Sequence, residues 1–257
     1  DGFNLADLVS YQTKNNDQPY PFGPSDGGSD DNMSWDSGGD PALRRQRLRN
    51  LWAILMLSRG VPMVVAGDEF GRTQNGNNNP WALDSPAMRN NYAMIATSAP
   101  QRVAVEDGTG AVYHDNLGVF DSRDERVNPL FRFATFLMRL RHRHPALCRA
   151  AWGDLEAGGE DVSYLFRTPD GDGSPREGDR ALAVHIDAPD DGFWVMINMS
   201  PDPVDFRVPA AGGGDVWRRL VDTAVGSEKD DNCWPEGEGE IVADGVAVQP
   251  WSIVVWH

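Results

Sequence analysis

The stretch that decides the fold is "GVPMVVAGDEFGRTQNGNNNPW", residues 60–81. It begins with a short apolar run, residues 63–66, of the kind that forms a strand buried on both faces of a sheet. An acid pair, Asp68 and Glu69, comes next, and asparagines occupy positions 75 and 77–79. A turn, a buried strand and a polar loop together predict a parallel α/β sheet, in which the loops after the strands form the active face.

Two helices are predicted on either side of this stretch. The first begins after Asp40, a favourable N-cap, and has Pro41 at its first helical position and Gly60 as a stop. Its large apolar residues recur at helical spacing: Leu48, Leu51, Trp52 and Leu55. The second helix is predicted over residues 129–143, ends before Pro145, and has five apolar residues on one face: Leu130, Phe133, Ala134, Leu137 and Leu140.

The pattern changes near residue 150. Short strand-like segments succeed one another without helical periodicity: "VSYLFR", "ALAVHI", "FWVMIN", "VDFRV", "VWRRLV" and "VAVQPWSIVVWH". Turn-rich stretches separate them, which predicts an antiparallel β-sandwich. We therefore expect an α/β part over residues 1–147 and an all-β domain over 148–257. Within the first part, "FNLADLVSY" is predicted to form a short helix, and the region up to residue 40 to form an ordered functional loop.

Composition excludes several classes of protein. The formal net charge of −16 disfavours nucleic acid, whose binding needs clustered Lys and Arg. The one basic cluster, "RRQRLR" at 44–49, is interpreted as a solvated helix face. No apolar run reaches the roughly 20 residues of a membrane helix, so no membrane partner is expected. Cys148 and Cys233 fit reduced thiols in a cytoplasmic protein, although the start at Asp1 leaves secretion open.

The asparagine-rich loop points towards a neutral ligand. Asn side chains both donate and accept hydrogen bonds, which suits a hydroxyl-rich molecule such as a carbohydrate, and Trp35 and Trp81 could cover sugar faces. The alternative is that Asn and Gly are simply turn formers here. His142 and His144 are interpreted as a charged helix end, "YHDN" at 113–116 as a loop, and "DGDGS" at 170–174 as a hairpin loop. No cofactor and no metal is implied.

Residues 60–81 resemble the segment around the eighth barrel strand of isoamylases and glycogen debranching enzymes in the α-amylase superfamily. The N-terminal "DGFNLADLVSY" is similar to the segment after the seventh strand, and "NNDQPYPFGPSDGGSDDNMSWD" is similar to a loop of the isoamylase branch. "LRHRHPAL" and the β-rich tail are similar to the last barrel helix and the C-terminal domain. The resemblance implies the C-terminal end of a (β/α)8 barrel followed by an antiparallel β-sandwich.

The resemblance also implies a set of site residues. Asp1 is similar to the third carboxylate of the family's catalytic trio, which stabilises the transition state, while the nucleophile and general acid lie upstream of this chain. Asp68 and Glu69 are then expected to brace loops, with a sugar contact for Asp68. The resemblance implies that the substrate-binding residues are Asp68, Arg72, Asn77, Asn78, Asn79 and Trp81.

The expected function is that of the C-terminal part of an enzyme that cleaves α-1,6 branches of glycogen or a related α-glucan by a retaining mechanism. The isolated chain is expected to be inactive. The alternative is a non-catalytic module that binds glucan or supports a partner. Because one strand cannot close a barrel, we expect residues 1–147 of the isolated chain to be partly disordered, self-associated or covered by another chain.

Overall fold

The computed structural model describes residues 2–97, 102–103, 111–148, 162–189, 191–211, 216–241 and 245–257. The chain divides into two compact units. Unit 1 comprises Asp1–Leu48 and Met63–Thr135, and unit 2 comprises Arg49–Pro62 and Phe136–His257. The separation into parts 1–147 and 148–257 stays a prediction, since the two units interleave and residues 149–161 lie outside the described chain.

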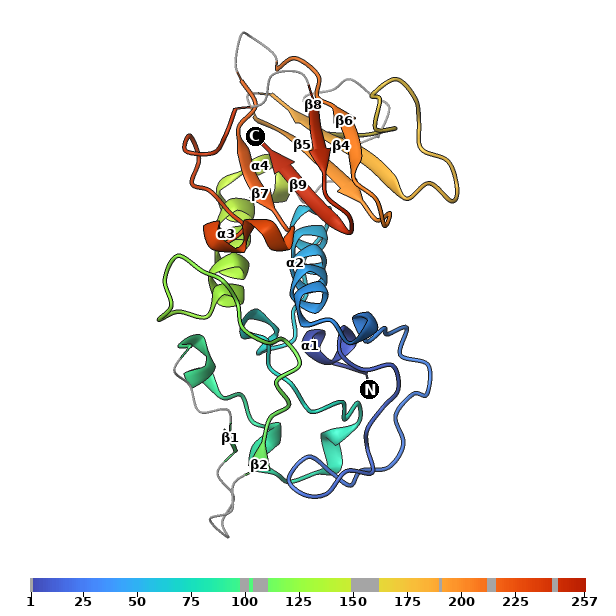
Figure 1. Cartoon of the computed structure of the whole chain (residues 1–257), viewed down its shortest axis with the longest axis vertical. Coiled ribbons are helices and arrows are strands. Elements are labelled where there is room, and N and C mark those ends of the chain that lie inside the picture. Colours follow the sequence, from blue (N-terminus) through green and yellow to red (C-terminus); the bar gives the residue numbers. More distant parts are fainter. Residues whose placement is uncertain are drawn as a thin grey trace. The chain divides into compact units, whose positions relative to one another are not determined.

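Two long helices form as their sequence predicts (Figure 1). Helix α2 spans Pro41–Leu57, and the Asp40 side chain accepts a hydrogen bond from the Ala42 N–H at 2.9 Å. Leu48 and Trp52 are buried, whereas Leu51 and Leu55 are half-buried. Helix α3 spans Pro129–Arg143, and all five apolar residues predicted for its inner face are at most 1% exposed. Helical periodicity therefore identified both helices correctly.

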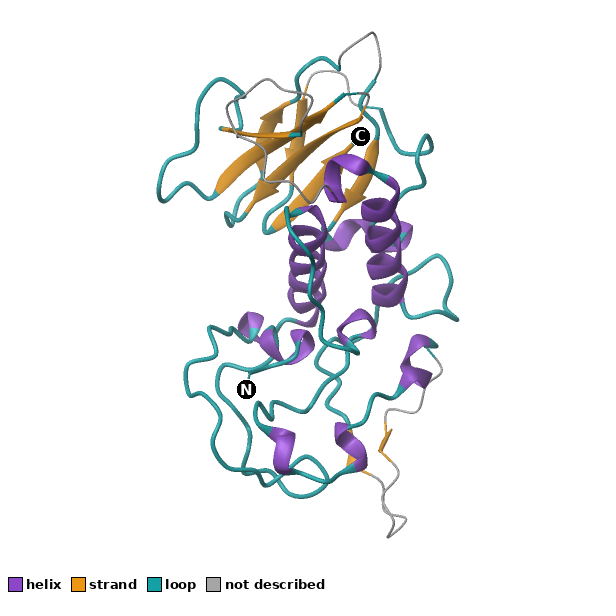
Figure 2. Ribbon diagram, turned by 180° about the vertical axis from the view of Figure 1, so that it is seen from behind, coloured by secondary structure: helices purple, strands orange, loops and turns teal. Residues whose placement is uncertain are grey.

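Unit 1 consists mainly of loops held between short helical turns, as the teal ribbon of Figure 2 shows. Helix α1, Leu5–Leu8, is the predicted short helix, and the Asn4 side chain caps it by accepting from the Asp7 N–H. The remaining elements are brief: η1 Ser37–Gly39, η2 Asp68–Phe70, η3 Pro80–Ala82, η4 Pro86–Met88, η5 Tyr92–Ile95, and the antiparallel pair β1 Arg102–Val103 and β2 Ala111–Val112.

The buried strand predicted at residues 63–66 is wrong for this structure. Residues 61–65 form no strand, and Met63 and Val65 are 90% and 55% exposed. A parallel strand is buried and hydrogen-bonded only through neighbouring strands, and the part of unit 1 that the structure describes supplies none beside this run. The run has the apolar composition of a buried strand, but among the described residues of unit 1 no strand pairs with it.

Unit 2 contains the β-rich region, and every predicted strand segment forms a strand. A five-stranded antiparallel sheet has the order β3-β4-β5-β9-β7, and β6 pairs with β8 in a second sheet (Figure 1). The bounds are β3 Ser163–Arg167, β4 Ala181–Ala188, β5 Asp191–Asn198, β6 Val204–Arg207, β7 Arg219–Asp222, β8 Gly245–Val248 and β9 Ser252–Trp256. The "DGDGS" stretch lies in the β3–β4 connection, as expected.

The two sheets share one apolar core. Trp194 and Met196 of β5 and Val254 and Trp256 of β9 alternate along their strands and pack with Phe206 of β6. Most of the intervening residues of β5 and β9 are buried too, so these central strands are covered on both faces. Helix α4, Pro145–Cys148, packs against β4 and β5.

The segment Arg49–Pro62 is attached to the rest of unit 2 by buried polar contacts. Arg49 pairs with Glu228 at 2.9 Å, and both side chains are at most 4% exposed. Arg141 of α3 donates to the carbonyl oxygens of Met56, Ser58 and Gly60, which lie in and after the last turn of α2. The solvated face expected for residues 44–49 is therefore wrong, because Arg45 and Arg49 are only 7% and 2% exposed.

The two cysteines and the length of the helices can be compared with what the sequence predicts. Cys148 and Cys233 are not joined in a disulfide, which agrees with the expected reduced thiols. Among the described residues, no helix has the length and apolar character required to span a bilayer.

Candidate functional site

The acid pair after the apolar run supports the loops around it. Asp68 accepts a hydrogen bond from the Leu5 N–H through Oδ1 at 2.9 Å, which ties η2 to α1. Glu69 accepts from the Gly67 N–H through Oε2 at 2.8 Å. Asp68 is 8% exposed, and its burial raises the pKa of the carboxyl group, while the Leu5 N–H lowers it. Both carboxylates therefore hold backbone, which agrees with the loop-bracing role expected for them.

A third carboxylate, that of Asp7 in α1, was missed by sequence reasoning. It is fully buried and accepts from the Thr73 hydroxyl at Oδ1 and from the Gln74 N–H at Oδ2, at 2.8 Å in the latter case. Burial raises the pKa of Asp7 to about 6, and the hydrogen bonds from Thr73 and Gln74 partly oppose this shift. The one signal in the sequence was an acid within the otherwise apolar "LADLV", which a short exposed helix would explain equally well.

The asparagine run joins the loop at 75–79 to the long loop that precedes α2. Asn77 is completely buried, accepts from the Ser25 hydroxyl and donates to the Phe22 carbonyl at 2.7 Å. Asn78 is 1% exposed and donates to the Ser29 carbonyl at 2.8 Å and to Asn32 Oδ1 at 2.7 Å. The amide groups thus replace the regular hydrogen bonding that this loop lacks.

The same run also bonds to the N-terminal segment. Asn16 and Asn78 are paired twice, because the Asn16 amide donates to Asn78 Oδ1 and the Asn78 N–H donates to Asn16 Oδ1, each at 3.1 Å. The Gly2 N–H donates to the Asn78 carbonyl at 2.9 Å. Asp1, the expected catalytic carboxylate, lies outside the described residues. Its neighbour Gly2 is nevertheless attached directly to the asparagine run.

The remaining expected substrate-binding residues differ in their access to solvent. Trp81 is 84% exposed and could cover one face of a sugar ring. Asn79 is half-buried and donates to the Asp26 carbonyl at 2.6 Å. Arg72 donates through Nη2 to the Met88 carbonyl at 2.8 Å. The Arg47 guanidinium lies over the indole ring of Trp35, 4.7 Å from the centre of that ring. The structure brings Asp68, Asn77 and Asn78 into buried loop contacts and leaves Trp81 at the surface.

A cavity of about 410 Å³ lies beside these contacts in unit 1. Asp7 and Thr73 line it, together with His114 and Asp115 of the "YHDN" segment, which is a loop as expected. The volume lies within the usual range of small-molecule pockets. Its polar groups come from three stretches far apart in sequence, so no single motif could have predicted it.

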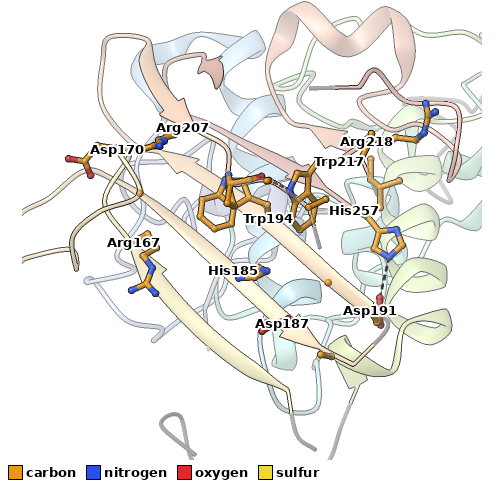
Figure 3. Close-up of a pocket in the computed structure, with 18 of the residues that line it drawn as sticks. Arg167, Asp170, His185, Asp187, Asp191, Trp194, Arg207, Trp217, Arg218 and His257 are labelled. Carbon is orange, nitrogen blue, oxygen red and sulfur yellow. Dashed lines mark hydrogen bonds and ion pairs between the residues drawn. The ribbon is translucent and has the colours of Figure 1, made fainter. Parts of the chain in front are cut away.

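A larger cavity, of about 1190 Å³, lies in unit 2 over the five-stranded sheet (Figure 3). Trp217, Trp194 and His185 line it with several charged residues, including Arg167, Asp187 and Arg207. Burial lowers the pKa of His185, which favours its neutral imidazole. His144 lies at the end of α3, as expected, but it is only 8% exposed and bonds to Asp191.

Comparison with solved structures defines the class of fold. The chain superposes on a pullulanase from Bacillus acidopullulyticus with a TM-score of 0.57, at 16% identity, over 100% of this chain and 23% of that one. It also matches the maltose complex of a type I pullulanase from Bacillus subtilis with a TM-score of 0.50, at 19% identity, over 84% and 24% of the two chains. The chain thus shares its fold with part of a pullulanase. No protein-family model matches the chain.

Comparison with curated proteins shows which proteins the sequence of this chain is similar to. The isoamylase of Flavobacterium sp. is 35% identical over 250 residues, which cover 95% of this chain and 28% of that protein. A glycogen operon protein GlgX homolog of Mycobacterium tuberculosis is 30% identical over 252 residues, covering 87% of this chain and 31% of that protein. The chain is related to isoamylases and glycogen debranching enzymes, which confirms the resemblance stated from its motifs. It spans less than a third of the length of these curated relatives.

Proposed function

We propose that this chain is the C-terminal part of an isoamylase-type debranching enzyme, which hydrolyses α-1,6 branch linkages in glycogen or a related α-glucan. The observation that carries the proposal is the 35% identity to an isoamylase, sustained over 95% of the chain. Residues 1–147 would then complete a (β/α)8 barrel, and residues 148–257 would form its C-terminal β-sandwich domain. Neighbouring barrel strands would cover the exposed run at residues 63–66.

The contacts of the described carboxylates support the proposal that the nucleophile and the general acid come from other parts of the parent enzyme. A retaining glycosidase needs a nucleophile and a general acid about 5 Å apart, both facing the scissile bond. Asp7 and Asp68 hold loop backbone instead, so neither is free to serve. Asp1 would face the developing positive charge of the transition state, and its two catalytic partners would come from other strands of the parent enzyme.

The buried amides support a particular way of binding glucan. Because Asn77 and Asn78 use their side chains to hold the preceding loop, their contribution to substrate binding would be to fix the wall of the groove. Direct contact with sugar would fall to exposed groups, and Trp81 offers the largest free aromatic face among the proposed residues. The proposed substrate is a neutral polymer, in keeping with a loop rich in amides.

The test is the release of reducing ends from glycogen by the parent enzyme and its variants. Asp1→Asn should lower kcat by several orders of magnitude, because a carboxylate facing the transition state acts mainly there. Trp81→Ala should chiefly raise KM, and Asp68→Asn should chiefly lower stability. The isolated chain should release nothing above a buffer control.

Two outcomes would contradict this assignment. The first is full turnover in Asp1→Asn together with lost turnover in Asp68→Asn, both measured on folded protein. The second is a parent without debranching activity that still binds glucan, which would favour the non-catalytic alternative.

A further inference from the structure

Two histidines and an aspartate meet where β5 begins and β9 ends, and these are neighbouring central strands of the five-stranded sheet in unit 2. His144 lies between α3 and α4, Asp191 begins β5, and His257 comes directly after β9. His144 Nδ1 lies 2.8 Å from Asp191 Oδ1. His257 Nε2 lies 3.2 Å from the same oxygen, a contact that Figure 3 shows. The three potential ligand atoms all lie within 4.8 Å of one another. Two imidazole nitrogens are therefore directed at a single carboxylate oxygen.

This donor set has the chemistry of a zinc site. Zn²⁺ binds imidazole nitrogen and carboxylate oxygen at about 2.0–2.2 Å in tetrahedral geometry, which places neighbouring ligand atoms roughly 3.3 Å apart. The two observed nitrogen–oxygen distances, 2.8 and 3.2 Å, are close to that spacing, and the two nitrogens lie within 4.8 Å of each other, so side-chain rotations would bring the three atoms around one ion. Ca²⁺ and Mg²⁺ favour all-oxygen sites, which two imidazoles do not provide. We propose that His144, Asp191 and His257 bind one Zn²⁺ ion.

Surrounding residues hold the three side chains as a metal site requires. Glu236 Oε1 lies 3.4 Å from His144 Nε2, the ring nitrogen that would not face the ion, and Arg143 fixes that carboxylate at 2.8 Å. Such an outer carboxylate orients a metal-bound imidazole and sets its tautomer. Asp191 Oδ2 accepts from the Ala146 N–H at 3.2 Å, which leaves Oδ1 for the ion.

Both histidines also lie against an apolar wall. The ring of Phe193, which is fully buried, is centred 5.0 Å from His144 and 4.8 Å from His257. The backbone of His257 is paired in both directions with Arg218, at 2.8 and 2.9 Å. Secondary structure and packing therefore hold the three side chains in place before an ion binds, so binding loses little side-chain conformational entropy.

The cluster is also accessible. Asp191 and His257 line the cavity of about 1190 Å³ in unit 2, which gives an ion a route to the ligands (Figure 3). Three protein ligands leave one tetrahedral position for water. The ion would link the α3–α4 junction, the start of β5 and the residue after β9, so its main effect would be to stabilise unit 2. This role is independent of the proposed glucan chemistry.

Zinc titration of the chelator-treated chain tests the proposal. A Cys148→Ser, Cys233→Ser background removes thiol ligands, and calorimetry or equilibrium dialysis then measures stoichiometry and Kd. One equivalent should bind with a Kd below about 1 μM, and a hundredfold excess of free zinc over Kd should raise Tm by roughly 5–10 °C. Bound Co²⁺ should show the intense visible absorption of four-coordinate cobalt.

Variants locate the ion. His257→Ala should weaken binding at least 100-fold, and Glu236→Gln should weaken it by about 10–100-fold through the orientation of His144. His142→Ala is the matched control, because His142 is exposed, lies two residues from His144 and should bind zinc unchanged.

The alternative is that the cluster is only a hydrogen-bonded network, with each imidazole donating to Asp191. Failure to bind one equivalent below about 10 μM would overturn the proposal. So would tight binding that His257→Ala and Glu236→Gln both leave intact. Circular dichroism of each metal-free variant, compared with the parent background, verifies that its fold is retained. A variant that fails this comparison is replaced by His257→Gln, for which the same loss is expected.

Discussion

Asp7 should make the stability of unit 1 fall as the pH rises from about 4 to about 6. Its pKa is raised from 3.8 to about 6 in the folded chain, because the carboxyl group is completely buried. The folded protein therefore holds a proton on Asp7 in a pH range where the unfolded chain has lost it. Stability from this group is complete below about pH 4 and is lost as the pH rises through 6.

The size of this loss in stability follows from the pKa of Asp7 in the unfolded and in the folded chain. Each pH unit of difference corresponds to about 1.4 kcal/mol, so the span from 3.8 to about 6 corresponds to about 3 kcal/mol. Asp7→Asn removes the titration but keeps one oxygen to accept from Thr73 or Gln74. The unfolding free energy of Asp7→Asn should therefore lack the pH dependence that the Asp7 carboxyl group contributes. The difference in unfolding free energy between parent and variant should change by about 3 kcal/mol over the window and then level off.

Two measurements check this. Carbon-detected NMR of the Asp7 carboxyl group reports its pKa directly, and urea unfolding between about pH 3.5 and 7.5 reports the stability difference at each pH. Asp17→Asn is the matched control for loss of a charge, because Asp17 is exposed in the same unit. A carboxyl group that titrates near 4, or a difference between parent and Asp7→Asn that is flat across the window, would refute the reasoning.

Two further predictions concern buried polar contacts. Glu228→Gln should destabilise unit 2 by about 3–5 kcal/mol in urea unfolding, because it removes the carboxylate that pairs with the buried Arg49 guanidinium. Arg49→Met with Glu228→Leu should recover most of the loss, and a loss below about 1 kcal/mol in Glu228→Gln would show that the pair is solvated. Gly28→Ala should expose the long loop before α2 to limited proteolysis, since a Cβ there would overlap Asn78 Oδ1 at a positive φ of 74°. Gly38→Ala, also at positive φ but with open space around it, should have a smaller effect, and equal cleavage of the two variants would contradict the contact.

Much of the fold could be predicted because it depends on local pattern. A helix satisfies its own hydrogen bonds, so the cap at Asp40 and the apolar spacing over residues 129–143 were enough to place both long helices. The strands after residue 160 were recognisable as short apolar segments separated by turn-rich stretches. Only β3, β4 and β5 lie beside their neighbours in the sequence, whereas β9 lies between β5 and β7 in the sheet. The family resemblance was likewise carried by contiguous motifs.

Contacts between distant residues were decided only by the tertiary structure. Residues 63–66 have the composition of a buried strand, but a strand needs neighbours, and its own sequence does not supply them. The arginines at 45 and 49 looked like a solvated face, yet Arg49 meets Glu228, 179 positions away. The buried roles of Asp7 and Asn78, and the meeting of His144 with Asp191, have the same origin. A polar side chain is stable in the interior only beside a partner, and the fold, rather than the local sequence, brings that partner to it.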